Sequence, residues 1–412
     1  MLSLFKKSSF VFKRVSIFLI LINLIYPQQI SSNLDFEFNS SESTNWWDIY
    51  NNEGLLPSDI KLEYTFNHSY RNIESNLSLF YNDNEFFLGE SFSKIFLNDS
   101  VYFKIGKYFR DFSQYLNDDL SSGHMLISKN AQPMPKIGLV INYSLKKNQY
   151  IDFKFGISHA NLDKNLTYRS SPFLHEKFIY LKNKKQDREW GIGLVHEAIW
   201  GGETYEYGEF PSSFNDYLKI FISADGPLLD GDAHANALGN HLGIWDFYFQ
   251  KNYTDKIFKA YYQHFFEDTS GLRFANKYDG LWGIEIDNYI KNLVILVEYL
   301  STINQDPTDD YLIDSYYNHT QYLDGWSYKN FVLGNPFIDN LDQNPSEVIH
   351  IGLLSKNFSD YFYQINLSRR ISVNDNLKYK IIFGKKFSNI SIKLFLSEDY
   401  ESQLGLGLSY QL

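Results

Sequence analysis

Aromatic, acidic and amide side chains follow one another closely in the segment 301–345. The residues of interest there are Tyr316, Asn318, Tyr322, Asp324, Trp326 and Tyr328. Flat aromatic faces pack against the C–H surfaces of sugar rings, and carboxylates and amides form hydrogen bonds with sugar hydroxyls. The pattern therefore predicts a polysaccharide-binding segment. The alternative is that these aromatic side chains pack the interior of a folded loop.

Two adjacent carboxylates, Glu267 and Asp268, stand at the end of a predicted strand. A glycosidase needs two carboxyl groups roughly 5–10 Å apart, one on each side of the scissile sugar bond. Neighbouring carboxylates in a turn more commonly bond the loop itself or a bound hydroxyl. We therefore add this pair to the predicted polysaccharide-binding set and assign no catalytic residue.

Histidines and a serine in the same region invite two further hypotheses. His234, His241 and His264 lack the spacing that puts two ligands on one helical face, and strand geometry alone does not bring them together. Ser270 follows His264 without the glycine-flanked elbow of a serine hydrolase. We predict neither a metal nor a cofactor, and no enzyme.

β-Strands must position these residues. The clearest are predicted over 241–251 and 256–266, with a tight turn at 252–255. The second strand sends alternate residues to opposite faces: Phe258, Ala260 and Tyr262 to one, Lys259, Tyr261 and Gln263 to the other. One end of this hairpin is short, while the other carries long polar loops at 224–240 and 267–279. That asymmetry is typical of outer-membrane barrels.

The same alternation of apolar and polar residues recurs along the chain, for example at 60–66, 151–157, 293–299 and 404–412. Counting such segments gives about eighteen strands, which is the range of bacterial outer-membrane barrels. The fold class predicted is all-β, a transmembrane antiparallel barrel over 60–412. The long segment 301–345 favours a folded cap, outside the barrel or within its lumen.

The strand count has a parity problem. When strands are counted back from Leu412, the turns at 252–255 and 288–292 lie at the periplasmic end of the barrel, where short turns are expected. Counted forward from Ile60, the long segment 111–135 also falls there, so one strand is missed or invented, between 200 and 230 or before Ile60. Residues 30–59 remain open as a linker, a short plug or a first strand.

Composition narrows the class of protein. Aromatic residues make up 18% of the 412 residues, yet the mean hydropathy is −0.34. This combination fits half-buried strands and aromatic girdles, although an array of secreted β-sandwiches has a similar bias. The lack of cysteine excludes disulfides and thiol nucleophiles, and the net charge of −11 offers no basic surface for nucleic acid.

The first 29 residues are predicted to be an export signal. Basic residues up to Arg14 precede the apolar run 15–26, which is too short for the ~20 residues of a membrane-spanning helix. No later apolar run is long enough to span a membrane as a helix. The mature chain is therefore expected to cross the outer membrane with strands.

At this point the sequence resembles the capsule assembly proteins of the Wzi type. The resemblance is carried by GNHLGIWDFYF, YYQHFFEDTSGLRF, DGLWGIEI, VEYLSTINQ, YYNHTQYLDGWSY and LGNP, in this order between 239 and 336. The motif positions are Gly239, Asn240, Gly243, Tyr262, Asp268, Gly271, Asp279, Gly280, Trp282, Gly283, Glu298 and Tyr299.

The resemblance implies an outer-membrane barrel of about eighteen strands, plugged by its loops, that holds exported polysaccharide as a lectin. Family members in enterobacteria carry a periplasmic helical bundle ahead of the barrel, and the short stretch before Ile60 is expected to lack it. The expected partners are extracellular polysaccharide, outer-membrane lipid and lipopolysaccharide, and the polysaccharide export machinery. We expect a monomer without nucleic-acid partners. The alternative function is a porin-like diffusion channel for sugars or small solutes.

Overall fold

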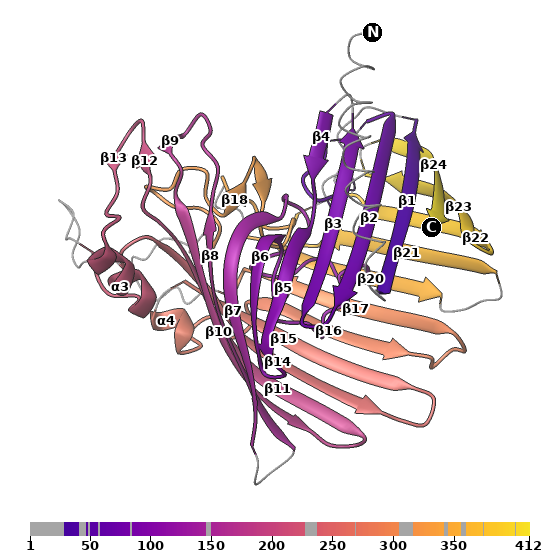
Figure 1. Ribbon diagram of the computed structural model, residues 1–412, viewed down its shortest axis with the longest axis horizontal. Helices are drawn as coiled ribbons and strands as arrows, with labels where there is room; N and C mark the ends of the chain where they lie inside the picture. The colour runs from indigo at the N-terminus through magenta and orange to yellow at the C-terminus, as the bar shows by residue number, and fades with distance from the viewer. Residues whose placement is uncertain are drawn as a thin grey trace.

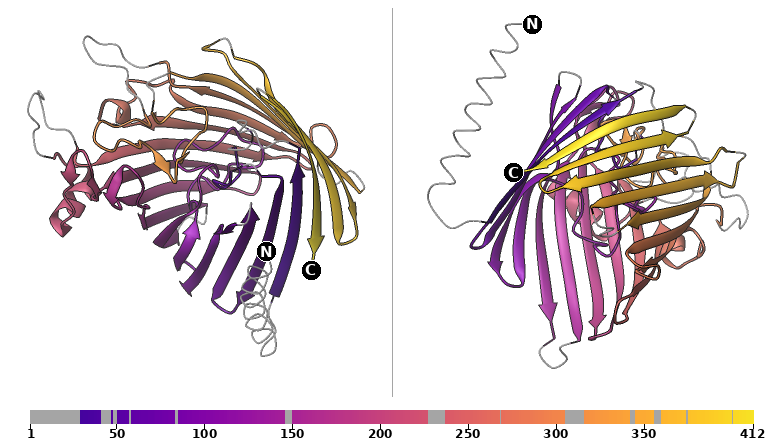
Figure 2. Two further views of the ribbon diagram at one scale, coloured as in Figure 1. Left: turned by 90° about the horizontal axis from the view of Figure 1, so that it is seen from above. Right: turned by 90° about the vertical axis from the view of Figure 1, so that its right-hand side faces the viewer.

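One continuous antiparallel sheet of nineteen strands contains the barrel wall in the computed structural model. Its first and last strands pair with each other, which closes the sheet into a barrel (Figures 1 and 2). The structure describes residues 29–412 except 41–46, 48–49, 57, 83–84, 146–149, 227–236, 268, 305–315, 342–344, 356–359, 374 and 400. The predicted export signal lies outside these residues, apart from Gln29.

Eighteen strands make the wall, which confirms the predicted barrel class. In chain order they are β1 (Gln29–Asn39), β2 (Ile60–Tyr70), β3 (Ile73–Asn82), β5 (Ser91–Asn98), β6 (Val101–Tyr108), β7 (Met134–Ser144), β8 (Ile151–Asn161), β10 (Phe173–Lys184), β11 (Arg188–Trp200), β14 (Asn240–Asn252), β15 (Ile257–Phe266), β16 (Gly280–Asp287), β17 (Leu293–Ser301), β20 (Glu347–Ser355), β21 (Tyr361–Arg370), β22 (Lys378–Phe387), β23 (Ile390–Glu398) and β24 (Ser402–Gln411). The nineteenth, β4 (Glu85–Leu88), is a short strand beside β3.

Strand β1 accounts for the parity problem. It pairs with β2 on one side and with β24 on the other, from Asn33 opposite Gln411 to Asn39 opposite Gly405. The barrel therefore begins at Gln29, ahead of the Ile60 start that the sequence suggested. With β1 counted, every long connection leaves from one rim, and the segment 111–135 is among them.

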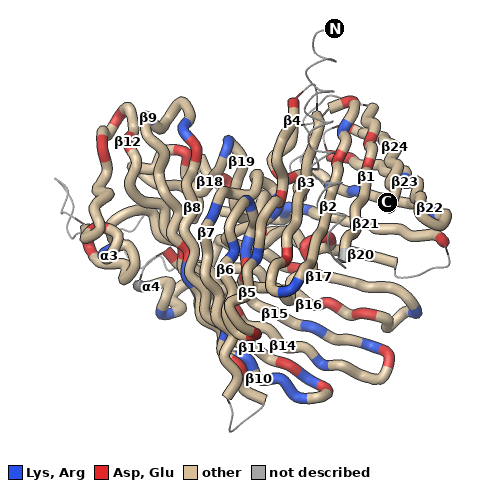
Figure 3. Tube along the Cα trace, in the orientation of Figure 1, with Lys and Arg blue, Asp and Glu red and all other residues tan. Residues whose placement is uncertain are grey.

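We call this edge the loop rim and the opposite edge the turn rim. Long connections on the loop rim are 40–59, 109–133, 162–172, 201–239, 267–279 and 302–346, and short connections such as 71–72, 99–100 and 253–256 lie on the turn rim. Acidic and basic residues cluster on the turns that join β14 to β15 and β16 to β17 (Figure 3). On the same rim, Lys251 near the end of β14 forms an ion pair with Asp187 in the turn between β10 and β11.

Alternate residues of each strand face the lumen and the outside. On β23 Ile392 and Leu394 are exposed on the outer wall, while Lys393 between them faces inward to Glu37 of β1. On β14 Asp246 and Tyr248 face inward, and Phe247 and Phe249 face outward. The outer wall is thus apolar and the inner wall carries the polar groups, as in a membrane barrel.

The remaining elements belong to the loop rim. A three-stranded sheet is formed by β9 (Tyr168–Ser170), β12 (Glu203–Thr204) and β13 (Gly208–Glu209), and a two-stranded one by β18 (Ser327–Tyr328) and β19 (Phe331–Val332). The described loop-rim connections also contain the helices α3 (Phe214–Ile222) and α4 (Thr269–Leu272). No helix in the described part of the chain is both long and apolar enough to cross a membrane.

Candidate functional site

Residues 109–133 fold inward from the loop rim and occupy the lumen; we call this segment the plug. Its main anchor is Asp246 on β14, whose carboxylate accepts hydrogen bonds of 2.5 Å from Ser113 and from Tyr180 of the wall. Tyr115 of the plug donates a further bond to the same carboxylate. A buried carboxylate requires such donors to be stable away from water.

A second anchor is the motif residue Glu298 on β17. Its carboxylate accepts bonds from the hydroxyl of Ser121 (2.7 Å) and the backbone N–H of Ser122 (2.6 Å), and also from Tyr261 on β15. Gly283 of the next strand leaves the space for that tyrosine, because a Cβ there would lie 2.1 Å from its ring. The motif glycine and glutamate therefore serve one plug contact.

Lysines of the wall bind backbone carbonyls of the plug. Lys136 donates to Phe109 (2.5 Å) and Lys259 donates to Tyr115 (2.7 Å). Each of these lysines also pairs with a wall carboxylate, Glu176 at 2.9 Å and Glu285 at 2.8 Å respectively. Both ion pairs therefore lie on the inner wall, where each lysine also holds the plug.

His124 is fully buried inside the plug and organises its turn. Its Nδ1 accepts the backbone N–H groups of Leu126 (2.9 Å) and Ile127 (3.2 Å), so its Nε2 carries the proton and lies 2.9 Å from the hydroxyl of Ser113. Burial lowers the pKa of His124 well below its usual value, which keeps the ring neutral. Ser113 accepts from this ring and donates to Asp246.

Above the plug lies a second layer, residues 316–341, which we call the cap. Trp326 donates its indole N–H to the carbonyl of Leu126 (2.9 Å), and Tyr317 donates to the carbonyl of Met125. Asn335 bonds the carbonyl of Gly123 at 2.9 Å. Plug, cap and inner wall share one apolar core. The lumen of this part of the barrel is therefore filled by protein.

Most of the predicted polysaccharide-binding residues belong to the cap, and the structure shows which neighbours they contact. Four aromatic side chains are buried: Tyr316, Tyr322, Trp326 and Tyr328. Asn318 donates to the carbonyl of Leu341 (2.7 Å), and Asp324 accepts from Thr167 (2.5 Å) and Asn165. Glu267 is half-buried, and Asp268 lies outside the described residues.

Asp279 links the cap to the motif region at the start of β16. It accepts bonds from the phenol of Tyr316 (2.6 Å) and the backbone N–H of Asn304 (2.7 Å). Asn276 bonds the same phenol at 2.6 Å. Burial raises the pKa of Tyr316 far above its usual value, so the phenol remains a hydrogen-bond donor.

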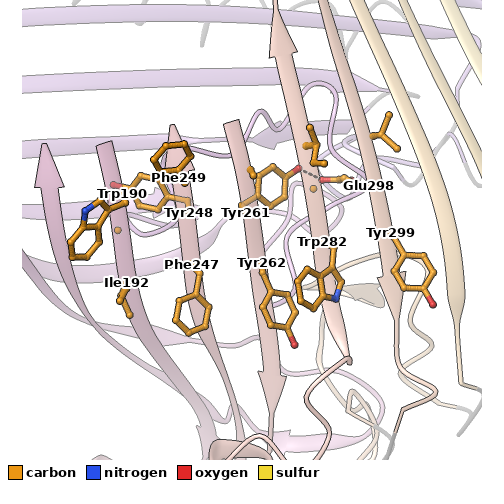
Figure 4. A pocket seen from close by; sticks show the side chains of 15 residues that line it. Trp190, Ile192, Phe247, Tyr248, Phe249, Tyr261, Tyr262, Trp282, Glu298 and Tyr299 are labelled. Atoms are coloured by element: carbon orange, nitrogen blue, oxygen red, sulfur yellow. Dashed lines mark hydrogen bonds between the residues drawn. The ribbon is translucent and has the colours of Figure 1, made fainter. Parts of the chain in front are cut away.

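Other motif residues shape the backbone or the outer wall. Gly239 and Gly280 have φ values of 97° and 132°, which favour glycine, and Asn240 and Gly243 lie buried on β14. Tyr262 and Trp282 stack on the outer wall with ring centroids 3.6 Å apart, beside an apolar groove of about 580 Å³ (Figure 4). Tyr299 donates to Glu347 at 2.5 Å, and Gly271 packs behind Phe266.

The accessible aromatic residues of the loop rim were not predicted. Tyr205 and Tyr207 are 70% and 47% exposed in the turn between β12 and β13, next to the ion pair of Arg169 with Glu203 (3.0 Å). We call the β9, β12 and β13 sheet the crown. The sequence TYEYGE carried a detectable signal, since aromatic and acidic residues alternate there beside a turn glycine.

The histidines that the sequence singled out contact different neighbours in the fold. His264 lies 2.9 Å from the carbonyl of Gly271 and stacks on Phe274. His241 lies 2.9 Å from His196, and His234 is outside the described residues. Among the residues that the structure describes, no group of three histidine or acidic side chains is arranged to hold a metal ion.

Comparison with known proteins gives one family. The family model for capsule assembly protein Wzi matches residues 62–343. Among solved structures, a double mutant and a triple mutant of the Rhodopseudomonas blastica porin each share 8% identity with the chain, cover 94% of it and 100% of their own length, and superpose with a TM-score of 0.40. No curated protein matches the chain.

Proposed function

The chain belongs to the capsule assembly protein Wzi family, and we propose that it is an outer-membrane lectin. It binds exported polysaccharide at its loop rim and supports the assembly or attachment of capsule or exopolysaccharide. In outer-membrane barrels the long loops are extracellular and the short turns periplasmic. The crown and the cap therefore face the polysaccharide outside the cell.

The observation that carries this proposal is the layered filling of the lumen. The plug bonds the wall through Asp246 and Glu298, and the cap bonds the plug through Trp326. A wide barrel whose loops fill its lumen lacks the open path that a diffusion channel needs. Polysaccharide would then contact the outer surface of the loops.

Within that surface, the crown has the residues that sugar binding requires. Tyr205 and Tyr207 offer exposed rings, and Arg169 and Glu203 offer charged hydrogen-bonding groups beside them. The predicted residues lie beneath: Tyr322 packs on Phe210 with centroids 4.7 Å apart. In this proposal the cap residues hold the crown in place, and the crown makes the sugar contact.

The test is binding of the producing strain's own polysaccharide to the refolded protein, with single-channel recording in parallel. The double variant Tyr205→Ala, Tyr207→Ala is expected to lose most of the retention of wild-type protein. Its matched control is Tyr253→Ala, Tyr289→Ala, which removes two exposed tyrosines from the turn rim. Equal loss in both variants, or no retention by the wild type, would overturn the proposal.

A polar cavity favours a second candidate function, a diffusion channel. It lies on the inner wall between β1, β2 and β22–β24 and is lined by Lys61, Lys380, Lys393 and Glu37, among others. Polar walls of this kind hold water and could pass ions. Steady conductance with a selectivity that Lys380→Glu shifts toward cations would favour the channel; a silent bilayer favours the lectin.

A further inference from the structure

The connection 201–239 places helix α3 on the outside of the barrel, beside β8, β10 and β11 (Figures 1 and 2). Tyr217 of the helix packs against three outward-facing side chains of the wall, with centroid distances of 5.3 Å to His175, 5.6 Å to Trp200 and 5.8 Å to His159. Ile220 is fully buried in the same contact. One side of α3 is thus fixed to the wall.

Local sequence defines this helix at both ends. Ser213 caps the N-terminus and forms a capping box with Asp216. The helix ends at Ser223 in a left-handed conformation. Near the C-terminus the ammonium of Lys177 on β10 donates to the free carbonyl of Phe221, where the helix leaves carbonyls unpaired and favours a cation.

The helix covers a polar part of an otherwise apolar outer wall. His175 is fully buried and neither of its ring nitrogens has a hydrogen-bond partner. Lys177 and His196 stand beside Ile179 and Leu194 of the lipid-facing band. A lysine facing lipid is unfavourable, most of all at the midplane, so a protein cover here is favourable.

A second side of α3 is apolar and exposed, next to a polar face that carries Asn215 and Lys219. Phe214, Leu218 and Ile222 are 73%, 47% and 71% exposed. A helix with a polar face and an exposed apolar face is typical of the membrane interface. Exposure of this apolar face to water would be unfavourable. Beside the lipid-facing wall, the face instead extends the apolar surface that contacts lipid.

Two apolar grooves flank the helix on the wall. The one on the Phe221 side has a volume of about 370 Å³ and is also lined by Phe155 and Ile179. The one on the Phe214 side has about 470 Å³ and is also lined by Phe103 and Ile157. Both are continuous with the lipid-facing wall, and Lys177, the one ammonium among their lining residues, is already bonded to α3. Their lining suits hydrocarbon.

We propose that α3 lies in the outer leaflet of the outer membrane and that α3 and its two flanking grooves form a binding surface for lipid acyl chains. The occupant is lipid, because the surface continues the wall that the outer membrane already covers. The helix then extends the barrel sideways into the leaflet at the level where the strands end.

The absence of cysteine allows a direct test on the full-length protein. Leu218→Cys and Ile222→Cys are each spin-labelled in reconstituted lipid vesicles, and access of oxygen and of a water-soluble nickel chelate to the label is measured. Ile284→Cys on the outer wall is the lipid reference, and Tyr205→Cys in the crown is the water reference.

Labels at 218 and 222 are expected to match the label at 284, with high oxygen access and little access of nickel. Nickel access as high as that at 205 would overturn the proposal. Retained heat-modifiable migration on gels identifies the folded variants. Labels at 218 and 222 that neither collider reaches would mean that protein covers the helix, which would also overturn it.

Discussion

The hydroxyl of Ser113 lies 2.5 Å from the carboxylate of Asp246, although the two residues are 133 positions apart in the chain. The bond joins the plug to β14, the strand that follows the connection 201–239 in the chain. Since Tyr115 and Tyr180 donate to the same carboxylate, one side chain holds two layers of the structure together.

Loss of this anchor should loosen the plug. In Asp246→Ala, three donors lose a charged acceptor, which costs on the order of 3 kcal/mol. Because the wall has its own strand ladder, the barrel should survive. We expect new, fluctuating conductance steps in planar bilayers. Asp187→Ala, which removes an exposed carboxylate on the turn rim, should leave conductance at the wild-type level.

Substitution of Glu197, unlike that of Asp246, should not destabilise the protein. The carboxyl group of Glu197 is fully buried on β11, directly opposite Glu176. Two carboxyl groups buried side by side are unfavourable, because burial and the neighbouring like charge both disfavour the ionised form. We expect Glu197→Gln to raise the unfolding midpoint or leave it unchanged, while Glu176→Gln, which weakens the pair with Lys136, should lower it. Unfolding in denaturant measures both.

Trp326 should stabilise the cap rather than contact the sugar. Its side chain is fully buried and bonds the plug at Leu126, and truncation of a buried Trp to Ala costs roughly 3–5 kcal/mol. We expect Trp326→Ala to make the loops sensitive to limited proteolysis with the barrel migration unchanged. If polysaccharide retention fell while the proteolysis pattern stayed at wild type, Trp326 would be a contact residue after all.

The loop 40–59 should respond to pH through Glu53. Burial, and next the nearby Glu63, raise the pKa of Glu53 to about 7 from 4.5. The folded loop therefore favours the protonated acid, so its stability is present at low pH and is lost as the pH rises from about 4.5 through 7. The protection of residues 50–56 against hydrogen exchange, relative to the intrinsic exchange rate at each pH, should fall across that window. Glu53→Gln should remove this fall.

The local alternation of apolar and polar residues was sufficient to predict the hairpin in the middle of the chain. Strands predicted at 241–251 and 256–266 are observed at Asn240–Asn252 and Ile257–Phe266, because alternating burial is written into each strand by itself. The place of β1 could not be decided in this way. Its partner β24 lies at the other end of the chain, and only closure of the barrel selects the strand over the linker or plug.

The site was less predictable for a related reason. An aromatic residue in a long loop suits a sugar ring and a protein core equally well, and contacts between distant segments decide which it meets. Trp326, for example, is buried where the cap packs on the plug, and it bonds Leu126, 200 positions earlier. Phe214 and Leu218 look like core residues in the sequence, and only the fold puts them on an outer surface. Tyr205 and Tyr207, which were not predicted, are the exposed aromatic residues to which our proposal assigns the sugar contact.

The connections of the plug imply an order of events during assembly. The plug lies in the first third of the chain, yet its bonding groups come from β14, β17 and β20, through Asp246, Glu298 and His350. These groups arrive later in synthesis, and the β1–β24 seam needs the final strand. The plug therefore lacks these partners until the wall is nearly complete, so docking of the plug and closure of the barrel both belong to the last stage of assembly.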